Sequence, residues 1–180
     1  MATTPEELFR YLSVQGIEVS TVTHPPLFTV ADSQALRGTI PGAHTKNLFA
    51  KDKKGRHFLV VADEEAQIDL KALSKMLGAA GRLSFASPEA MMELLGVTPG
   101  AVTAFGVIND ESRRVEVVLD RTLLSHDMVN CHPLTNEATT SLRPADLMAF
   151  FRSTGHEPLV LDLPAPEARP ENPSDTQGDA

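Results

Sequence analysis

The sequence predicts a single α/β (α+β) domain in which helices flank a mixed, curled β-sheet. The chain has 180 residues, of which 42% are hydrophobic, and this suits one domain with a sizeable core. Segments of helical and strand periodicity alternate along the chain, and short turns join several of the strands, which indicates a mixed sheet. We expect the domain to span residues 1–163. A disordered acidic tail should follow over residues 164–180, where Pro, Glu, Asp, Ser and Gly dominate.

The first elements follow from capping residues and periodicity. Ser, Thr and Asp before a run of helical periodicity accept hydrogen bonds from the first free N–H groups, and proline is tolerated in the first turn. Strict alternation of apolar and polar residues instead indicates a strand. The expected elements are a helix from Pro5 capped by Thr3 or Thr4, a strand over residues 17–21, and a helix from a Thr29 cap to Arg37, ended by Gly38.

The stretch from His44 to Val61 predicts a β-hairpin, because a polar turn over residues 51–56 with Gly55 separates two apolar runs. It is also the most basic part of a chain whose net charge is -8. The net charge argues against non-specific nucleic-acid binding by the whole surface, whereas the hairpin is the expected place for contact with a polyanion.

The second half of the chain predicts further helices and short strands. The expected elements are helices over residues 69–77, 88–95 and 144–154, strands over 82–85 and 158–163, and a hairpin over 107–110 and 115–120. The glycine-rich segment 96–106 has two interpretations. It is either a tight connection that needs positive φ, or a wall of main-chain N–H groups that approaches a ligand and stabilises an oxyanion.

The residues that could carry chemistry are few. Cys131 is the one cysteine, which excludes an internal disulfide and fits a reducing compartment. Adjacent strand residues point to opposite faces, so Cys131 and His132 are not expected to pair. The histidines form no metal-binding motif, and no dinucleotide or phosphate-loop glycine motif occurs, so we expect no metal and no cofactor. Without an apolar leader or a long apolar run, the protein is expected to be cytoplasmic.

A polar run from His132 to Asn136, continued by residues 139–141, interrupts the apolar periodicity. It is either a loop followed by a helix cap, or the rim of a pocket that presents hydroxyl and amide groups.

Taken in order, these stretches resemble the YbaK / prolyl-tRNA editing superfamily, and most of all its free-standing ProX type (ProXp-ala). The resemblance covers most of residues 20–160 and excludes the tail. It rests on Thr45-Lys46-Asn47-Leu48-Phe49, Lys51-Asp52-Lys53-Lys54-Gly55, Asp69-Leu70-Lys71, Leu83-Ser84-Phe85-Ala86-Ser87, Leu95-Gly96-Val97-Thr98-Pro99-Gly100, Val107-Ile108-Asn109-Asp110, His132-Pro133-Leu134 and Thr139-Thr140.

The resemblance implies an α/β fold with a curled mixed sheet and a trans-editing aminoacyl-tRNA deacylase that removes alanine from mischarged tRNA(Pro). The partners would be the acceptor end of tRNA(Pro) and, transiently, prolyl-tRNA synthetase, without membrane or DNA. The expected catalytic residues are Lys46, Gly100, Ala101 and His132. The expected substrate-binding residues are Thr45, Asn47, Thr103 and an apolar lining of Met128, Val129 and Leu134. The expected tRNA-binding residues are Lys51, Lys53, Lys54, Arg56 and Arg82.

In this scheme the N–H groups near Gly100 and Ala101 hold the ester carbonyl or the attacking water. Lys46 binds the carbonyl or the terminal phosphate. His132 positions water or the ribose hydroxyl, and Asn47 or carbonyl oxygens receive the substrate ammonium group.

One departure leaves alternatives open. The family motif Gly-x-x-x-Pro ends here at Ala104 instead of proline. The chain is therefore interpreted as a deacylase for alanine, as one for cysteine or serine, or as a non-catalytic module that binds aminoacyl-tRNA or a synthetase. A general nucleic-acid-binding protein is disfavoured, because no aromatic residues interleave with the basic ones in the hairpin turn.

Overall fold

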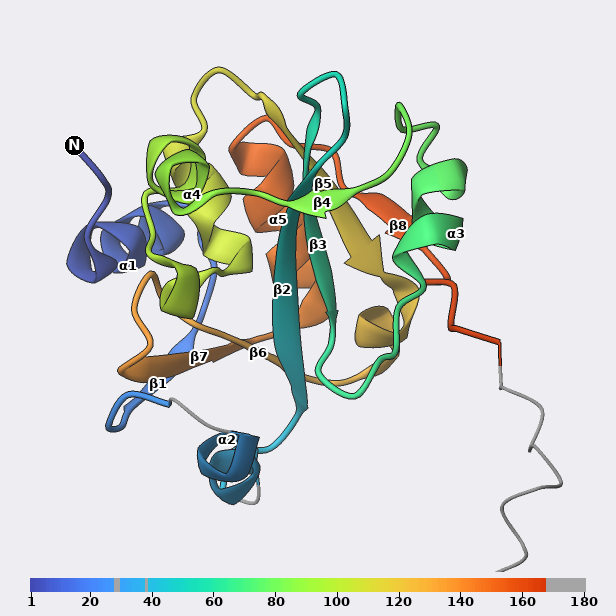
Figure 1. Ribbon diagram of the computed structural model, residues 1–180. Helices are drawn as coiled ribbons and strands as arrows, with labels where there is room; N and C mark the ends of the chain where they lie inside the picture. The colour runs from blue at the N-terminus through green and yellow to red at the C-terminus, as the bar shows by residue number, and fades with distance from the viewer. Residues whose placement is uncertain (28–29, 38, 168–180) are drawn as a thin grey trace, which may run out of the picture.

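A mixed eight-stranded sheet organises the computed structural model, which describes residues 1–27, 30–37 and 39–167 (Figure 1). The strands are β1 Ser20–Thr23, β2 Ala43–Lys51, β3 His57–Asp63, β4 Ser84–Phe85, β5 Val115–Asp120, β6 Val129–Cys131, β7 Ala138–Leu142 and β8 Leu159–Leu161. The helices are α1 Pro5–Val14, α2 Val30–Arg37, α3 Leu70–Met76, α4 Pro88–Leu95 and α5 Pro144–Ser153, and short 3-10 helices are η1 Pro99–Ala101, η2 Ala104–Asn109 and η3 Arg121–Ser125. The predicted fold class is confirmed.

The central pair of strands is the predicted hairpin. Strands β2 and β3 pair in antiparallel fashion from Thr45 opposite Asp63 to Lys51 opposite His57. The carboxylate of Asp52 holds the turn, because it accepts hydrogen bonds from the main-chain N–H groups of Lys54, Arg56 and Ala80. These bonds, led by the one from Ala80, lower the pKa of Asp52 below its ordinary value.

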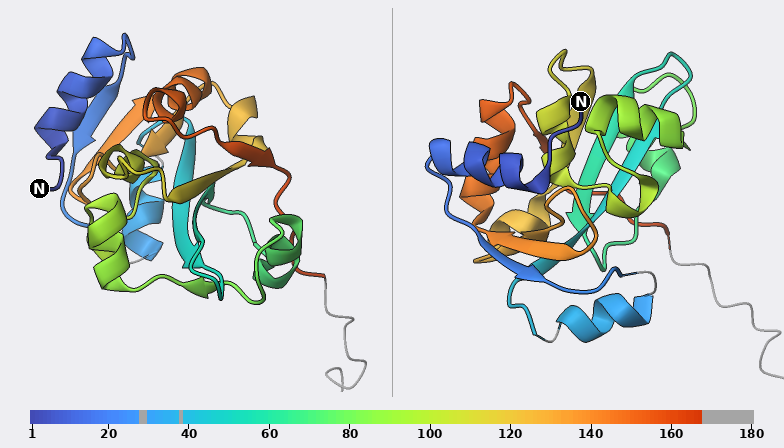
Figure 2. Two further views of the ribbon diagram at one scale, coloured as in Figure 1. Left: turned by 90° about the horizontal axis from the view of Figure 1, so that it is seen from above. Right: turned by 90° about the vertical axis from the view of Figure 1, so that its left-hand side faces the viewer.

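Helices cover both faces of this part of the sheet, because β3 is apolar on both sides. Phe58 and Val60 pack with Leu73 and Leu77 beneath α3. Leu59 and Val61 belong to the larger core, which also holds buried side chains of α1, α4 and α5. Figure 2 shows α3 on one side of the sheet and α1, α4 and α5 on the other. An apolar run on both faces is typical of a strand that helices cover on each side.

One edge of β2 is divided between two partners. β3 pairs along the opposite edge, whereas β6 pairs only with Ala43 and His44 and β4 only with Ala50 and Lys51. Between these short pairings, residues 45–49 of that edge have no strand beside them in the described part of the chain. The sheet therefore opens at this place, and the loop that carries η1 faces the opening.

The helix boundaries follow the capping residues closely. Thr4 and Glu7 form a capping box at α1, Asp69 caps α3, and Ser87 caps α4 ahead of Pro88. Gly96 ends α4 with φ of 65°, a conformation that favours glycine. A Cβ at this position would lie 2.5 Å from Nδ2 of Asn109, so packing also requires a glycine.

Three sequence predictions of secondary structure are corrected. The first strand is β1 over Ser20–Thr23, later than residues 17–21, because Ile17 instead completes the end of α1 by donating its N–H to the carbonyl of Leu12. Residues 107–110 are not a strand but lie in and after η2, where Asn109 binds the carbonyl of Leu95 through its side chain. Strands β6 and β7 were not predicted; residues 139–141, expected in a loop or a helix cap, lie in β7.

The C-terminal part ends as an edge of the sheet. β8 pairs in parallel with β5, in agreement with the predicted edge strand. Beyond it, the carbonyl of Pro164 accepts the N–H of Asp69, which ties the segment to the start of α3. Residues 168–180 of the predicted tail, the expected cap Thr29 and the expected stop Gly38 lie outside the described residues. Among the described helices, none combines the length and the apolar character that crossing a bilayer requires.

Candidate active site

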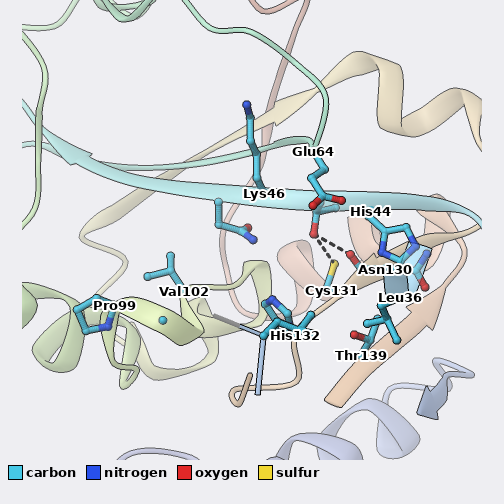
Figure 3. A pocket seen from close by; sticks show the side chains of 14 residues that line it. Leu36, His44, Lys46, Glu64, Pro99, Val102, Asn130, Cys131, His132 and Thr139 are labelled. Carbon is cyan, nitrogen blue, oxygen red and sulfur yellow. Dashed lines mark hydrogen bonds between the residues drawn. The ribbon is translucent and has the colours of Figure 1, made fainter. Parts of the chain in front are cut away.

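A pocket of about 380 Å³ lies at the opening beside β2. Its walls come from β2, from the end of β6 and the residue after it, from β7, from the η1 loop and from α2 (Figure 3). The lining residues are Leu27, Leu36, His44, Thr45, Lys46, Asn47, Glu64, Pro99, Gly100, Val102, Asn130, Cys131, His132 and Thr139. Among the predicted site residues, the structure thus brings together Thr45, Lys46, Asn47, Gly100 and His132.

Two side chains of β2 that point the same way form the wall between the strands. Thr45 donates its hydroxyl to the main-chain carbonyl of Asn130 at 2.7 Å, which closes the sheet just beyond the β2–β6 pairing. Asn47 is two residues further on, and its Oδ1 atom is buried without a hydrogen-bond partner among the described residues. A buried acceptor left unpaired costs about 1–3 kcal/mol, so Asn47 is placed to accept a hydrogen bond from a ligand.

Lys46 leaves β2 in the opposite direction, as strand alternation requires. Its ammonium group donates a hydrogen bond to the main-chain carbonyl of Ala66, in the segment between β3 and α3. Figure 3 shows the side chain directed away from Val102 and His132. The aliphatic part of Lys46 therefore contributes to the pocket wall, while its charge lies toward the outer surface.

His132 presents one ring nitrogen to the pocket as an acceptor. Its Nδ1 atom lies 3.3 Å from the carbonyl oxygen of Ala138, and since a carbonyl can only accept, Nδ1 carries the hydrogen. Burial lowers the pKa of His132, and the nearby His24 and His44 act in the same direction, while the bond to Ala138 and the charge of Glu64 oppose them. The ring is therefore neutral near pH 7, and Nε2 holds a lone pair.

The backbone around His132 is held by Thr103. The Thr103 side chain is fully buried, and its hydroxyl donates to the main-chain carbonyl of His132. The same hydroxyl accepts the N–H of Phe105 at the start of η2. Thr103 does not line the pocket; it links the η1–η2 loop to the histidine that does.

The two predicted main-chain donors of the η1 loop differ. The N–H of Ala101 donates to the carbonyl of Thr98 at 2.9 Å, and its side chain is buried away from the pocket. Gly100 lines the pocket, and no hydrogen bond of the described residues engages its N–H. A Cβ added at Gly100 would meet only Nδ2 of Asn136, at 3.8 Å. Of these two donors, Gly100 is thus the one that stands open to a ligand.

The apolar side of the pocket differs from the one expected. Val129 is fully buried in the larger core and Leu134 packs against it, while Met128 adjoins Gly42; none of the three lines the pocket. Its apolar lining comes instead from Leu27, Leu36, Pro99 and Val102. Leu36 lies in α2, which no sequence motif linked to the site.

Cys131 also borders the pocket, and its side chain is in the protonated thiol form at neutral pH. It is 2% exposed, and burial raises its pKa to about 12. At neutral pH the thiolate, which is the nucleophilic form, is scarce. The arrangement therefore does not support covalent chemistry at this sulfur.

Several polar residues that line the pocket were not predicted from the sequence. His44, Glu64, Asn130 and Thr139 were absent from the expected site. The hydroxyl of Thr139 forms a hydrogen bond with Nε2 of His24 at 2.9 Å. The only sequence signal that pointed to Thr139 was the interpretation of the polar run after His132 as the rim of a pocket. Among the described residues, no group of three His, Cys, Asp or Glu side chains is placed to hold a metal ion.

The predicted RNA-binding cations do not behave alike. Arg56 forms an ion pair with Glu116 at 2.8 Å and lies over the ring of Phe58, and the Glu116 hydrogen bond raises its pKa. Lys51, Lys53, Lys54 and Arg82 are exposed and form no ion pair among the described residues. Of these five cations, Arg56 is thus the one that already forms an ion pair within the described part of the chain.

Comparisons with known proteins agree on one family. A model of the aminoacyl-tRNA editing domain matches residues 24–150. Prolyl-tRNA synthetase associated domain-containing protein 1 of Danio rerio is 40% identical over 160 residues, which cover 88% of this chain and 86% of that protein. Prolyl-tRNA editing protein ProX of Acetoanaerobium sticklandii is 38% identical over 148 residues, 82% of this chain and 90% of that protein.

A solved structure also matches the fold. It is described as a candidate trans-editing enzyme for prolyl tRNA synthetase, and it superposes with a TM-score of 0.69 over 91% of this chain and 98% of that chain. At 24% identity this likeness bears on the fold alone.

Proposed function

Because the chain belongs to the aminoacyl-tRNA editing domain family, as its motifs predicted, we propose that it is a trans-acting deacylase of mischarged tRNA(Pro), with Ala-tRNA(Pro) as substrate. One observation carries the proposal beyond family membership. The pocket combines a buried acceptor without a partner on Asn47, a neutral His132 and the open N–H of Gly100. An amino acid ester offers a matching ammonium group, a hydroxyl and a carbonyl oxygen.

The reaction needs little acid–base machinery. Water attacks the carbonyl carbon of the ester, the bond from that carbon to the ribose oxygen breaks, and the proton that water loses ends on the ribose oxygen. Free amino acid and the tRNA hydroxyl result. The ester is already activated, so holding water near the carbonyl and stabilising the oxyanion supply most of the rate.

Three groups of the pocket take these roles in our proposal. The N–H of Gly100 donates to the developing oxyanion, as preorganised main-chain donors do in other acyl transfers. Nε2 of His132 accepts a hydrogen bond from the attacking water or the neighbouring ribose hydroxyl. Oδ1 of Asn47 accepts a hydrogen bond from the substrate ammonium group, which gives that buried oxygen its missing partner.

Lys46 acts from outside the pocket in this proposal. Its ammonium group is bound to the carbonyl of Ala66 and directed away from His132, which favours contact with the terminal phosphate over contact with the ester carbonyl. There we propose that the ammonium group exchanges its carbonyl partner for a phosphate, which is the stronger, charge-assisted partner.

Selection of alanine rests on space. A synthetase site made for proline cannot strongly reject a smaller side chain, because missing methylene groups are worth only about 1–3 kcal/mol. The pocket here is bounded by Leu27, Leu36 and Val102, and we propose that these side chains admit a methyl group and collide with the proline ring. Serine and cysteine are the competing substrates of similar size.

A panel of charged tRNAs tests the proposal. The protein is incubated with tRNA(Pro) that carries alanine, serine, cysteine or proline, and with Ala-tRNA(Ala), and release of the amino acid is followed. We expect loss of Ala-tRNA(Pro) well above the buffer rate, with Pro-tRNA(Pro) spared. Equal release from all the tRNAs would contradict the selection, and binding without release would favour the alternative of a non-catalytic module.

A further inference from the structure

A second cavity lies away from the pocket, between α3 and the segment that leads into β4. It is a groove of about 1010 Å³ lined by Leu70, Lys71, Ser74, Lys75, Ala79, Gly81, Arg82, Leu83, Ser84 and Phe85. We name this the α3–β4 groove. Its lining combines apolar side chains with basic ones from α3 and from the segment before β4, and of these residues the sequence predicted only Arg82 as a contact for tRNA.

The α3–β4 groove carries positive charge that the protein leaves uncompensated. Lys71, Lys75 and Arg82 are exposed and form no ion pair among the described residues. By contrast, many arginines elsewhere are paired within the chain, namely Arg56, Arg114, Arg121, Arg143 and Arg152. Free cations gathered on one face of a chain with net charge -8 indicate an anionic partner at that face.

The basic hairpin turn adjoins the α3–β4 groove. Lys51 pairs with Ser84, and the side chain of Lys53 lies beside Gly81, where an added Cβ would come within 2.8 Å of its Cδ atom. Two acids of these segments are engaged by main-chain N–H groups: the carboxylate of Asp52 binds N–H groups of the turn and of Ala80, and that of Asp69 caps α3. The unpaired lysines of the turn and of α3 thus form one basic surface.

Phe85 gives this surface an aromatic face. It is 63% exposed and lies outside the core, whereas five phenylalanines are buried in the core, namely Phe49, Phe58, Phe105, Phe150 and Phe151. An exposed aromatic ring next to free cations is the combination that binds single-stranded nucleic acid, because a base stacks on the ring while its phosphates meet the cations. A protein partner of acidic character would meet the cations but would not require an aromatic face.

We infer that the α3–β4 groove binds an unpaired nucleotide of the RNA substrate, with the base stacked on Phe85 and the flanking phosphates against Lys71, Lys75 and Arg82. The inference rests on the proposed function, since the pocket would hold the terminal aminoacylated adenosine. Strand β2 connects the two places: from Asn47 in the pocket to Lys51 at the groove is four residues, or about 13 Å along a strand. A short run of nucleotides spans this length.

Binding of uncharged RNA tests the groove independently of hydrolysis. The probe is a labelled acceptor-stem minihelix of tRNA(Pro) with its single-stranded 3′ end, and fluorescence anisotropy gives its Kd. Phe85→Ala should weaken binding by about 5- to 150-fold, the value of one lost base stack. Phe85→Tyr keeps an aromatic face and should bind like the wild type, whereas Phe85→Leu keeps apolar area alone and should bind like Phe85→Ala.

The phosphate contacts have their own measurement. The double variant Lys71→Gln/Lys75→Gln should flatten the slope of log K against log salt by about 1.4, since each lost contact with a single strand is worth about 0.7. Arg10→Gln, on α1 at the far side of the molecule, is the matched control and should leave Kd and slope unchanged (Figure 1).

Several results would overturn the inference. They are unchanged binding in Phe85→Ala, wild-type binding in Phe85→Leu, an unchanged salt slope in the lysine variant, or the same response to Phe85→Ala for a blunt minihelix that lacks the unpaired 3′ nucleotides. Any of these results, together with intact hydrolysis of Ala-tRNA(Pro), would contradict only the role of the α3–β4 groove. Normal RNA binding without any hydrolysis would instead contradict the proposed function and remain consistent with RNA binding in the groove.

Discussion

The ammonium group of Lys46 is hydrogen-bonded to the main-chain carbonyl of Ala66, on the side of β2 away from His132. The lysine and the histidine therefore lie on opposite sides of the strand that separates the pocket from the outer surface. In the proposed reaction, His132 therefore contacts the ester, and Lys46 contacts the RNA outside the pocket.

Removing the charge of Lys46 should therefore weaken substrate binding more than the chemical step. For Lys46→Met, which keeps the aliphatic stem, we expect kcat/KM for Ala-tRNA(Pro) to fall about 10- to 150-fold, the value of one charge-assisted hydrogen bond of about 1.5–3 kcal/mol. The loss should appear mainly in KM, as steady-state kinetics at several salt concentrations would show. Lys46→Arg, which keeps the charge, should recover part of it. An effect confined to kcat would place Lys46 at the reacting carbonyl instead.

The neutral state of His132 predicts the pH profile of hydrolysis. Burial lowers its pKa below the ordinary 6.5, so Nε2 stays an acceptor through neutral pH. The rate should be flat above about pH 6.5 with respect to this group and should fall on acidification through the lowered pKa. His132→Gln should be slow at every pH and should lack this acidic limb. A limb that persists in His132→Gln would belong to another group.

Protein stability should follow the same titration. The unfolded chain binds a proton at His132 at a higher pH than the folded chain, so the free energy of unfolding decreases as pH falls below 6.5. The decrease continues down to the folded pKa. Urea unfolding of the wild type and of His132→Gln across this range should diverge on the acidic side. Parallel curves would contradict the lowered pKa.

Gly100 offers a test of the main-chain donor, because its backbone has no need of glycine for a positive φ. A methyl group there would meet only Nδ2 of Asn136 at 3.8 Å, so Gly100→Ala should fold with a stability close to that of the wild type. The methyl group would nevertheless occupy the side of the pocket where the ester carbonyl approaches the N–H. We expect kcat to fall about 10²-fold or more, as on loss of an oxyanion donor. Full activity would show that the ester does not approach this loop.

A buried pair of side chains far from the pocket, Asp110 and His156, should affect stability but not hydrolysis. Asp110 accepts hydrogen bonds from the N–H groups of Arg114 and Val115 and lies 2.9 Å from Nε2 of His156, and both side chains of the pair are almost fully buried. Breaking such a pair costs about 3–5 kcal/mol, so Asp110→Ala should lower the free energy of unfolding in urea by that amount. Surface substitution Glu111→Ala is the neighbouring control and should change it by less than about 0.5 kcal/mol.

Much of the fold was predictable because its signals are local. The hairpin of β2 and β3, the Asp69 cap of α3, and the span of α4 from Ser87 to Gly96 all depend on residues close in sequence. Strands β6 and β7 are short, and β7 consists of Thr and Ser as much as of apolar residues, so their pairing depends on distant partners such as β1 and β2. The turn of η2 likewise depends on Asn109 reaching back to Leu95.

The site was predictable to the extent that motif residues share one strand. Thr45, Lys46 and Asn47 are consecutive on β2, and the resemblance placed them together with Gly100 and His132. The orientation and the partners of these groups could not be predicted from the sequence. The ammonium group of Lys46 points away from the pocket, the N–H of Ala101 donates to the carbonyl of Thr98, and Arg56 forms an ion pair with Glu116. The apolar lining from Leu27 and Leu36 depends on how α2 packs over the opening, which no local pattern encodes.

One experiment tests both the proposed activity and the proposed site: the single-turnover rate of alanine release from Ala-tRNA(Pro) with the protein in excess. It is measured for the wild type and for His132→Ala, with Arg10→Gln as a control on the far surface. We expect release by the wild type far above the spontaneous rate, a loss of about 10²-fold or more in His132→Ala, and no loss in Arg10→Gln. A wild type no faster than buffer would contradict the proposed activity, and His132→Ala as fast as the wild type would contradict the proposed site.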